Sequence, residues 1–363
     1  MADSSGPGRA SSCNRREFLA WLAARASGAA LIPFAAHAAE PFKGRKKMLR
    51  GVALAGAEFG QLIPGQHGRD YIYPGAAEYA RCAAQGFNVV RLPFKWDRLQ
   101  PDLGGAFAEE EWRFITQAIK HTKRARLALI LDPHNYAHRR VRDDDFTIDH
   151  LIGSDRVPAS AFIAFWRELA RRTKQHNHLI YGLMNEPADI GAEAWRDIAN
   201  ATLAAIRDTG ATNLVIVPGT AYTGAHSWIE AGNTALEAIR DPADNFAIEV
   251  HQYLDADSSG RSGATVSGTI GVERLQAFQS WARGHNLKAF LGEFGAGQDA
   301  VSLKALAAIV SEVENNRDVW IGWTAWAAGP WWPDDDPLRL SPSRNGIVPP
   351  QMKLLSKRAR SKP

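Results

Sequence analysis

Two glutamates stand in short and unusual contexts, far apart in the chain. Glu186 lies in the segment LMNEP (183–187), and Glu293 lies in FLGEFG (290–295). Each follows an apolar run typical of a buried strand, so each carboxylate is expected where a strand leaves the core. Two carboxylates from different strands that face one cavity are the groups that hydrolysis of a glycosidic bond requires. One protonates the departing oxygen, and the other attacks the sugar or activates water.

The elements that must position these acids follow a simple alternation from residue 51 onward. Apolar runs typical of strands cover 51–59, 87–93, 127–133, 179–185, 213–218, 246–252, 287–292 and 319–326. Helical patterns cover 75–85, 109–124, 159–176, 192–209, 271–285, 301–315 and a short 350–359. Eight such βα units predict an α/β protein built as a single (β/α)8 barrel.

A barrel of this kind carries its chemistry at the carboxyl ends of the strands. Six of the eight expected strands end in polar or aromatic residues: Arg91, His134, Asn185 with Glu186, His251 with Tyr253, Glu293, and Trp326. These side chains are therefore expected at one rim. His134 and His251 could instead form a metal pair, but no third ligand has suitable spacing, so the sequence favours hydrogen-bonding histidines. Glu58 and Asp132 are interpreted equally well as hydrogen-bonding groups of the rim or as substrate contacts.

Several segments resemble the motifs of glycoside hydrolase family 5, retaining β-glycanases with a (β/α)8 fold. The finer resemblance is to the branch of endo-β-1,4-glucanases, or cellulases. The segments that carry it are AGAEFG (55–60), HQYLDAD (251–257), LGEFG (291–295) and WAAGPWW (326–332). The resemblance covers about residues 50 to 350. It implies that Glu186 is the acid/base, that Glu293 is the nucleophile, and that no metal or cofactor takes part.

These two roles make different electrostatic demands. The acid must keep its proton, which calls for an apolar setting that Met184 and Pro187 could supply. The nucleophile must stay ionised, and Arg91 and the Tyr253 hydroxyl are its expected partners; Arg91 could also be only a structural ion-pair partner. Retention of configuration predicts carboxyl groups roughly 5 to 5.5 Å apart.

Other residues are expected to bind sugar. Asn185 is expected to hold the sugar 2-hydroxyl, and Trp326 to form the platform at the scissile subsite. Tryptophans in candidate rim loops could line neighbouring subsites: Trp96, Trp228, Trp331 and Trp332. Tryptophans within helical patterns are expected mostly in the core: Trp112, Trp166, Trp195 and Trp281. Asp255 and Asp257 could bond glucosyl hydroxyls or belong to a solvated turn.

Composition narrows the class of protein. The chain has 363 residues, of which 45% are hydrophobic, and a net charge of +4. The basic excess lies at the two ends, so the body is near neutral and a nucleic-acid surface is disfavoured. Residues 351–363 are interpreted as a basic, solvated C-terminal tail. No required protein partner is indicated, and the expected ligand is a β-glucan polysaccharide or oligosaccharide.

The first 38 residues are interpreted as an export signal. Arg15 and Arg16 precede a weakly apolar stretch, and the Ala36-His37-Ala38 segment offers small residues for cleavage. The paired arginines resemble a twin-arginine signal, with an ordinary signal or a retained membrane anchor as alternatives. The sequence thus predicts a periplasmic or extracellular enzyme with its catalytic barrel at 39–350.

The predicted activity is endo-β-1,4-glucanase. Alternatives are a retaining β-glycanase on mannan, xyloglucan or mixed-linkage glucan, since one catalytic constellation serves all of these substrates. A barrel that binds carbohydrate without turnover is a further alternative.

Overall fold

The computed structural model describes residues 47–143 and 146–361, all of which fall in one compact unit, 39–363. The expected export signal at 1–38 lies outside the described residues. Ten strands are present in the described part: β1 (Leu49–Leu54), β2 (Val89–Phe94), β3 (Ala128–Pro133), β4 (His138–Asp143), β5 (Phe146–Leu151), β6 (Leu179–Gly182), β7 (Val215–Pro218), β8 (Phe246–His251), β9 (Ala289–Glu293) and β10 (Trp320–Ala328).

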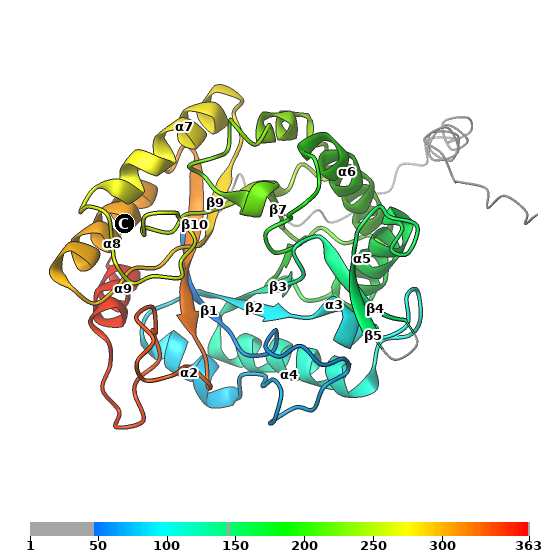
Figure 1. Cartoon of the computed structure of the whole chain (residues 1–363), viewed down its shortest axis with the longest axis horizontal. Coiled ribbons are helices and arrows are strands. Elements are labelled where there is room, and N and C mark those ends of the chain that lie inside the picture. The colour runs from blue at the N-terminus through cyan, green and yellow to red at the C-terminus, as the bar shows by residue number, and fades with distance from the viewer. Residues whose placement is uncertain (1–46, 144–145, 362–363) are drawn as a thin grey trace, which may run out of the picture. The chain divides into compact units, whose positions relative to one another are not determined.

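Eight of these strands form a closed barrel in the order β1-β10-β9-β8-β7-β6-β3-β2, and each strand is parallel to both of its neighbours. Helices surround the strands (Figure 1). They are α2 (Ala76–Ala84), α3 (Trp96–Leu99), α4 (Glu109–Ala125), α5 (Ala159–Thr173), α6 (Ala192–Asp208), α7 (Ile270–Gly284), α8 (Ala300–Asn315) and α9 (Pro350–Arg360), with short 3-10 turns η2 (Ala221–Thr223) and η3 (Asn233–Ala238). The predicted (β/α)8 barrel is confirmed.

The short helix expected at 350–359 is confirmed as α9. It buries Gln351, Met352 and Leu355, so this part of the expected basic tail packs against the barrel instead of being solvated. The Gln351 amide donates to the carbonyls of Ala296 at 3.2 Å and Pro337 at 2.9 Å. The prediction of a solvated tail was based on the basic residues of this segment. The buried residues between them recur at helical spacing and form one face of α9. Within the described residues, no helix is both long enough and apolar enough to cross a membrane.

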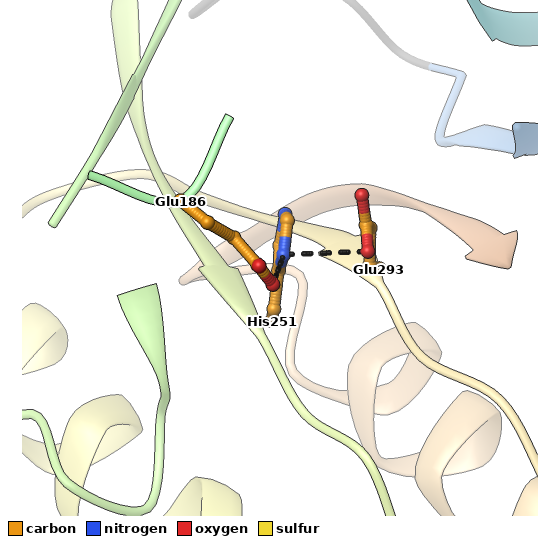
Figure 2. A group of neighbouring side chains, drawn as sticks. All are labelled: Glu186, His251 and Glu293. Atoms are coloured by element: carbon orange, nitrogen blue, oxygen red, sulfur yellow. Dashed lines mark hydrogen bonds and ion pairs between the residues drawn. The ribbon is translucent and has the colours of Figure 1, made fainter. Parts of the chain in front are cut away.

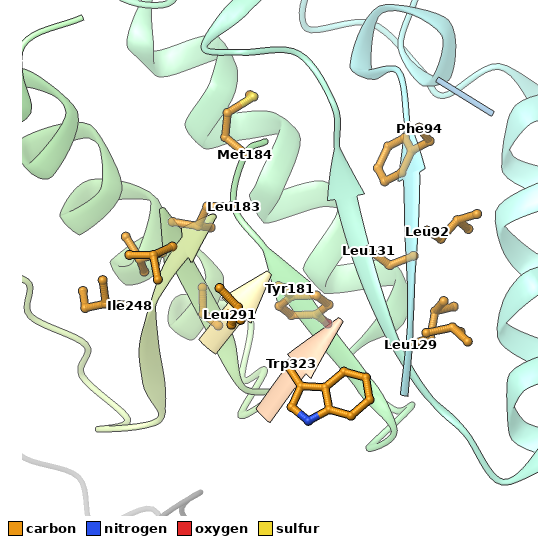
Figure 3. Close-up of a cluster of buried hydrophobic side chains, with 14 of the residues drawn as sticks. Leu92, Phe94, Leu129, Leu131, Tyr181, Leu183, Met184, Ile248, Leu291 and Trp323 are labelled. Atoms are coloured by element: carbon orange, nitrogen blue, oxygen red, sulfur yellow. The ribbon is translucent and has the colours of Figure 1, made fainter. Parts of the chain in front are cut away.

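The core has one large cluster and two smaller ones, and it is divided because alternate residues of a strand face opposite sides. Outward-facing strand residues such as Leu129, Leu131 and Leu291 join helix residues in one large buried cluster (Figure 3). Inward-facing residues at the amino ends of the strands form a second, smaller cluster: Leu49, Val89, Ile130, Ile180, Leu214, Ile216, Ala247, Phe290 and Ile321. This apolar layer closes the bottom of the barrel.

A charged layer lies directly above it. It is formed by Arg91, Asp132 and Glu249. Each lies two positions after a residue of the apolar layer (Val89, Ile130 and Ala247) and therefore faces the same inner side of its strand. The Glu249 side chain also explains why residue 292 is a glycine, because a Cβ at Gly292 would lie 1.9 Å from a carboxylate oxygen of Glu249. Only glycine leaves room for an acid at this depth.

Candidate active site

Glu293 ends β9 with only 4% of its side chain exposed. One carboxylate oxygen accepts a hydrogen bond from Arg91, and the other accepts the Tyr253 hydroxyl at 2.8 Å. Burial by itself would raise the pKa of Glu293, but the charges of His251 and Arg91 outweigh burial and lower the pKa below its ordinary value. The structure thus places both expected partners against this carboxylate and keeps it ionised.

Glu186 approaches Glu293 from the other side of His251 (Figure 2). The Nδ1–H of His251 donates to Glu186 Oε1 at 2.7 Å and lies 3.6 Å from Glu293 Oε2. One carboxylate oxygen of Glu186 and one of Glu293 lie within 4.8 Å of each other. Glu186 keeps 15% of its side chain exposed, so a ligand can reach it.

The backbone at Glu186 is strained, and its setting differs from the prediction. Its φ is +44°, in the left-handed region that side-chain-bearing residues avoid. Met184, expected to provide an apolar setting, belongs instead to the large cluster between strands and helices. A charged histidine is the actual partner of the Glu186 carboxylate, because His251 on β8 extends into the barrel mouth.

Arg91 connects four strands of the barrel. Its side chain is 1% exposed, and its guanidinium lies 3.2 Å from Asp132 and 3.5 Å from Glu249, in addition to its bond with Glu293. The same group donates to Asn185 Oδ1 at 2.8 Å. The Asn185 Nδ2 atom is buried and has no partner among the described residues.

Aromatic rings form another side of the site. Trp326 at the end of β10 stacks on His134, with ring centroids 5.4 Å apart and planes 17° apart. Nδ1 of His134 hydrogen bonds Asp132 at 2.9 Å. Trp332 meets Trp326 edge-on at 6.4 Å and Phe59 at 6.1 Å. Trp326, Trp331 and Trp332 are all partly exposed, which leaves an apolar aromatic surface accessible to solvent.

A cleft of about 760 Å³ opens beside Glu186 and His251. An adjoining hollow of about 350 Å³ shares Tyr136, His138 and Asp189 with it, so the two form one extended groove over the carboxyl ends of the strands. A further hollow of about 750 Å³ includes residues 88 and 126–128 at the amino ends of the strands, the end that barrel enzymes do not use for chemistry.

An extended groove beside Glu186, two adjacent carboxylates and partly exposed tryptophans after β10 suit hydrolysis of a polymeric sugar. The model of the family described as cellulase (glycosyl hydrolase family 5) matches residues 51–329. The chain belongs to glycosyl hydrolase family 5. It is therefore a glycoside hydrolase, and its barrel is the fold of that family.

Individual relatives agree with this assignment. Endo-beta-1,4-glucanase B of Aspergillus niger is 34% identical over 281 residues, which span 77% of this chain and 81% of that protein. The crystal structure of an endo-beta-1,4-glucanase from Xanthomonas axonopodis pv. citri is 47% identical, with a TM-score of 0.82, and the match covers 86% of this chain and 99% of that one. A structure of XacCel5A in complex with cellopentaose is 44% identical, with a TM-score of 0.81 over 85% of this chain and 98% of that one.

Three expected sugar contacts of this family 5 hydrolase lie elsewhere. Trp96 and Trp228 are fully buried in the core and line neither hollow of the groove. Asp255 is 3% exposed, and its carboxylate accepts from Gly260 N at 3.1 Å and Ser262 N at 3.2 Å within its own loop. Asp257 is exposed and lines the cleft. The expected core positions of Trp166, Trp195 and Trp281 are confirmed, while Trp112 is partly buried.

Glu58 and Asp132, which the sequence left between hydrogen bonding at the rim and substrate contact, are hydrogen-bonding groups of the barrel. Asp132 pairs with Arg91 and His134. Glu58 is buried and accepts the Gly56 N–H at 2.7 Å, and burial raises its pKa.

Sequence reasoning missed other residues of the site. Tyr136, His138 and Tyr222 line the cleft but lie in a hairpin or turns without a strong strand or helix pattern. Glu249 had a readable signal, because it is a charged residue two positions before His251 in an otherwise apolar strand.

The group of Glu186, His251 and Glu293 also has the spacing of three metal ligands. His251 Nδ1 is already bonded to Glu186, and His134 Nδ1 to Asp132, so the two histidines have separate hydrogen-bonding roles. Activity without a metal or cofactor stays a prediction.

The buried His251 predicts a pH dependence of stability. Burial opposes its charged form, but the carboxylates of Glu293, Glu186 and Glu249 outweigh burial and raise the pKa of His251 to about 10. The folded protein then holds this proton more tightly than the unfolded chain does. The stability gained is complete below about pH 6.5 and is lost as pH rises towards 10, by at most about 1.4 kcal/mol per pH unit.

Urea unfolding at several pH values between 6.5 and 10 measures this loss. A His251→Gln variant should be less stable at pH 6.5 but lose less free energy of unfolding as the pH rises. Ile347→Ala, which changes an exposed apolar side chain and no titratable group, should keep the parent slope. Equal slopes in the parent and His251→Gln would contradict the assignment of the charge to His251.

Proposed function

We propose that this family 5 hydrolase is a retaining endo-β-1,4-glucanase that cleaves internal bonds of cellulose or related β-glucans. The observation that carries the proposal is the spacing of the two glutamates, with oxygens within 4.8 Å. Retaining enzymes hold their carboxyl groups about 5 to 5.5 Å apart, whereas inverting enzymes need about 6.5 to 9.5 Å to admit a water. The named activity of the relatives supports the choice of β-1,4-glucan.

The proposed reaction has two displacements. In the first, Glu186 gives its proton to the glycosidic oxygen while Glu293 attacks the anomeric carbon, so the leaving sugar departs and a glycosyl ester forms on Glu293. In the second, Glu186 takes a proton from water, and the water oxygen displaces Glu293 from the anomeric carbon. Two inversions at one carbon give net retention.

The surrounding residues support this sequence of steps. Arg91 and Tyr253 stabilise the ionised Glu293. The loss of that charge on ester formation favours the ionised form of Glu186, which can then act as the base towards water. The free Nδ2 of Asn185 is available for the 2-hydroxyl, a contact that tightens in the transition state. Trp326 offers the platform for the sugar beside Glu293.

Product analysis and a substrate panel test the proposal together. Proton NMR during hydrolysis of cellopentaose should show the β-anomer first, with the α-anomer rising only by mutarotation. On carboxymethylcellulose, viscosity should fall well before reducing ends accumulate, as internal cleavage requires. An α-anomer as first product would overturn the retaining mechanism. Activity on mannan or xyloglucan without activity on carboxymethylcellulose or barley glucan would overturn the assigned substrate.

We also propose that residues 1–38 export the enzyme to the periplasm or the medium, on the basis of the paired Arg15 and Arg16. Fractionation of cells that express the full chain tests this proposal, since glucanase activity confined to the cytoplasm contradicts it.

A further inference from the structure

The hollow of about 750 Å³ at the amino ends of the strands lies at the end of the barrel opposite the two proposed catalytic glutamates. Its lining comes from the segment before β1, the end of α4 with the turn that follows it, and the loop before β6. It includes three cations, Lys47, Lys123 and Arg126, together with His176 and His178. No acid lines this basic hollow among the residues that the structure describes. The proposed hydrolysis makes no use of it.

The cations of the basic hollow have no counter-charge in the described part of the chain. Lys47, Lys123 and Arg126 form neither an ion pair nor a side-chain hydrogen bond there. Several exposed arginines elsewhere are paired with acids: Arg69 with Asp70, Arg171 with Glu168, and Arg283 with Asp318. Like charges that line one hollow repel one another, and an anion between them relieves that repulsion.

Two histidines respond to the same charge. Burial and then the charge of Lys123 lower the pKa of His176. Burial also lowers the pKa of His178, and the bond of its Nε2–H to the Ile119 carbonyl at 3.2 Å offsets burial only in part. Both imidazoles are therefore mainly neutral at pH 7, and an anion in the hollow would favour their charged forms.

Hydrogen bonds of the backbone hold the walls of the basic hollow in place. Arg126 caps α4 in the left-handed conformation, with a φ of +58°, and the Leu127 N–H donates to the Thr122 carbonyl at 2.9 Å. Glycine is the usual residue at such a cap, so backbone preference does not explain an arginine there. On the other wall, the His178 carbonyl accepts the Leu129 N–H at 2.9 Å. A ligand would therefore meet loops that are already ordered.

These features together match a tetrahedral oxyanion. Lysine and arginine side chains donate charge-assisted hydrogen bonds to phosphate and sulfate oxygens, and a charged imidazole adds further donors. A concave hollow of this size suits a small molecule. We propose that the basic hollow binds a small ligand with a phosphate or sulfate group, with Lys123 and Arg126 as its main contacts and His176 and His178 as supporting donors. This site is independent of the proposed function, so its failure would leave the glucanase proposal untouched.

Titration calorimetry of the full chain with sodium sulfate tests the site, with sodium chloride of equal ionic strength as the blank. The parent should bind sulfate saturably. Lys123→Gln and Arg126→Gln should each weaken that binding by about tenfold, the scale of one lost charge-assisted hydrogen bond. The control is Lys304→Gln, at an exposed lysine of α8 that does not line the hollow, and it should bind sulfate like the parent.

The pH dependence of sulfate binding tests the histidines. Sulfate stays dianionic between pH 5.5 and 8, and lysine and arginine side chains in general do not titrate in this range. Because the bound anion favours the charged imidazoles, affinity should rise by about tenfold from pH 8 to pH 5.5. The double variant His176→Gln, His178→Gln should lose most of this rise and keep nearly the parent affinity at pH 8.

The source of the oxyanion is distinguished by glucose 6-phosphate and inorganic phosphate. Tighter binding of glucose 6-phosphate would assign the site to a phosphorylated or sulfated small molecule, and tighter binding of inorganic phosphate would assign it to the free ion. A parent that binds neither sulfate nor phosphate would overturn the site and make the hollow a solvated surface. Parent-like sulfate binding by both Lys123→Gln and Arg126→Gln, with circular dichroism showing that they fold, would overturn it as well. A pH-independent affinity in the parent would remove the two histidines from the site.

Discussion

Glu293→Gln should reduce kcat on carboxymethylcellulose by about 10⁴-fold or more, the scale expected when a covalent nucleophile is removed. The amide has nearly the same volume as the carboxyl group but lacks the charge and the nucleophilic oxygen. The variant should still fold, because Asp132 and Glu249 continue to neutralise Arg91. Reducing-end release and thermal unfolding measure the two effects separately.

The matched control is Glu193→Gln at an exposed acid of α6, which should keep parent activity. Azide gives a second, positive test with Glu293→Ala. The small anion can enter the space left by the side chain and attack the anomeric carbon once, with the leaving group departing, which gives an α-glycosyl azide. A Glu293→Gln variant as active as the parent would remove Glu293 from the mechanism and would favour a different nucleophile.

The barrel could be predicted because burial on both faces makes its strands nearly continuous apolar runs. All eight predicted runs overlap barrel strands, and their ends differ by only a few residues. At β6, for example, the prediction of 179–185 continues past Gly182, where the structure ends the strand. The hairpin of β4 and β5 was missed because its segments carry many charges and no apolar run. The chain pairs there through the backbone, which the composition does not reveal.

The site was predictable to the extent that a barrel directs strand ends to one rim. That rule brought together Arg91, Glu186, His251 and Glu293 from four strands. The rule failed for residues that were assigned to loops, because a position in a loop does not determine whether the side chain is buried or exposed. Trp96 and Trp228 were expected at the rim and are in the core, where a large apolar side chain gains most from burial.

The charged residues near the rim explain why the predicted apolar setting of Glu186 was wrong. The sequence around it is apolar, so an apolar setting was inferred. The actual setting comes from β8, 65 residues away, through the bond between His251 and Glu186. Because Glu249 in turn contacts both His251 and Arg91, the two proposed catalytic acids share one buried network. Such coupling depends on inter-strand contacts that no single segment contains.

Glu186→Ala should have an effect that depends on the leaving group, which distinguishes a general acid from a nucleophile. On cellopentaose the sugar alkoxide needs a proton to depart, so kcat/KM should fall by about 10² to 10⁴-fold. On β-cellobiosyl fluoride no such proton is required, so the glycosyl ester on Glu293 should form at nearly the parent rate.

The ester formed by Glu186→Ala should then accumulate, because no base activates water. Rapid mixing should therefore show a burst of fluoride followed by slow turnover. Azide, which needs no base, should speed that turnover and give a β-glycosyl azide, the opposite anomer from the one expected with Glu293→Ala. Equal losses on both substrates, or the same azide anomer from both variants, would contradict the separate roles assigned to the two glutamates.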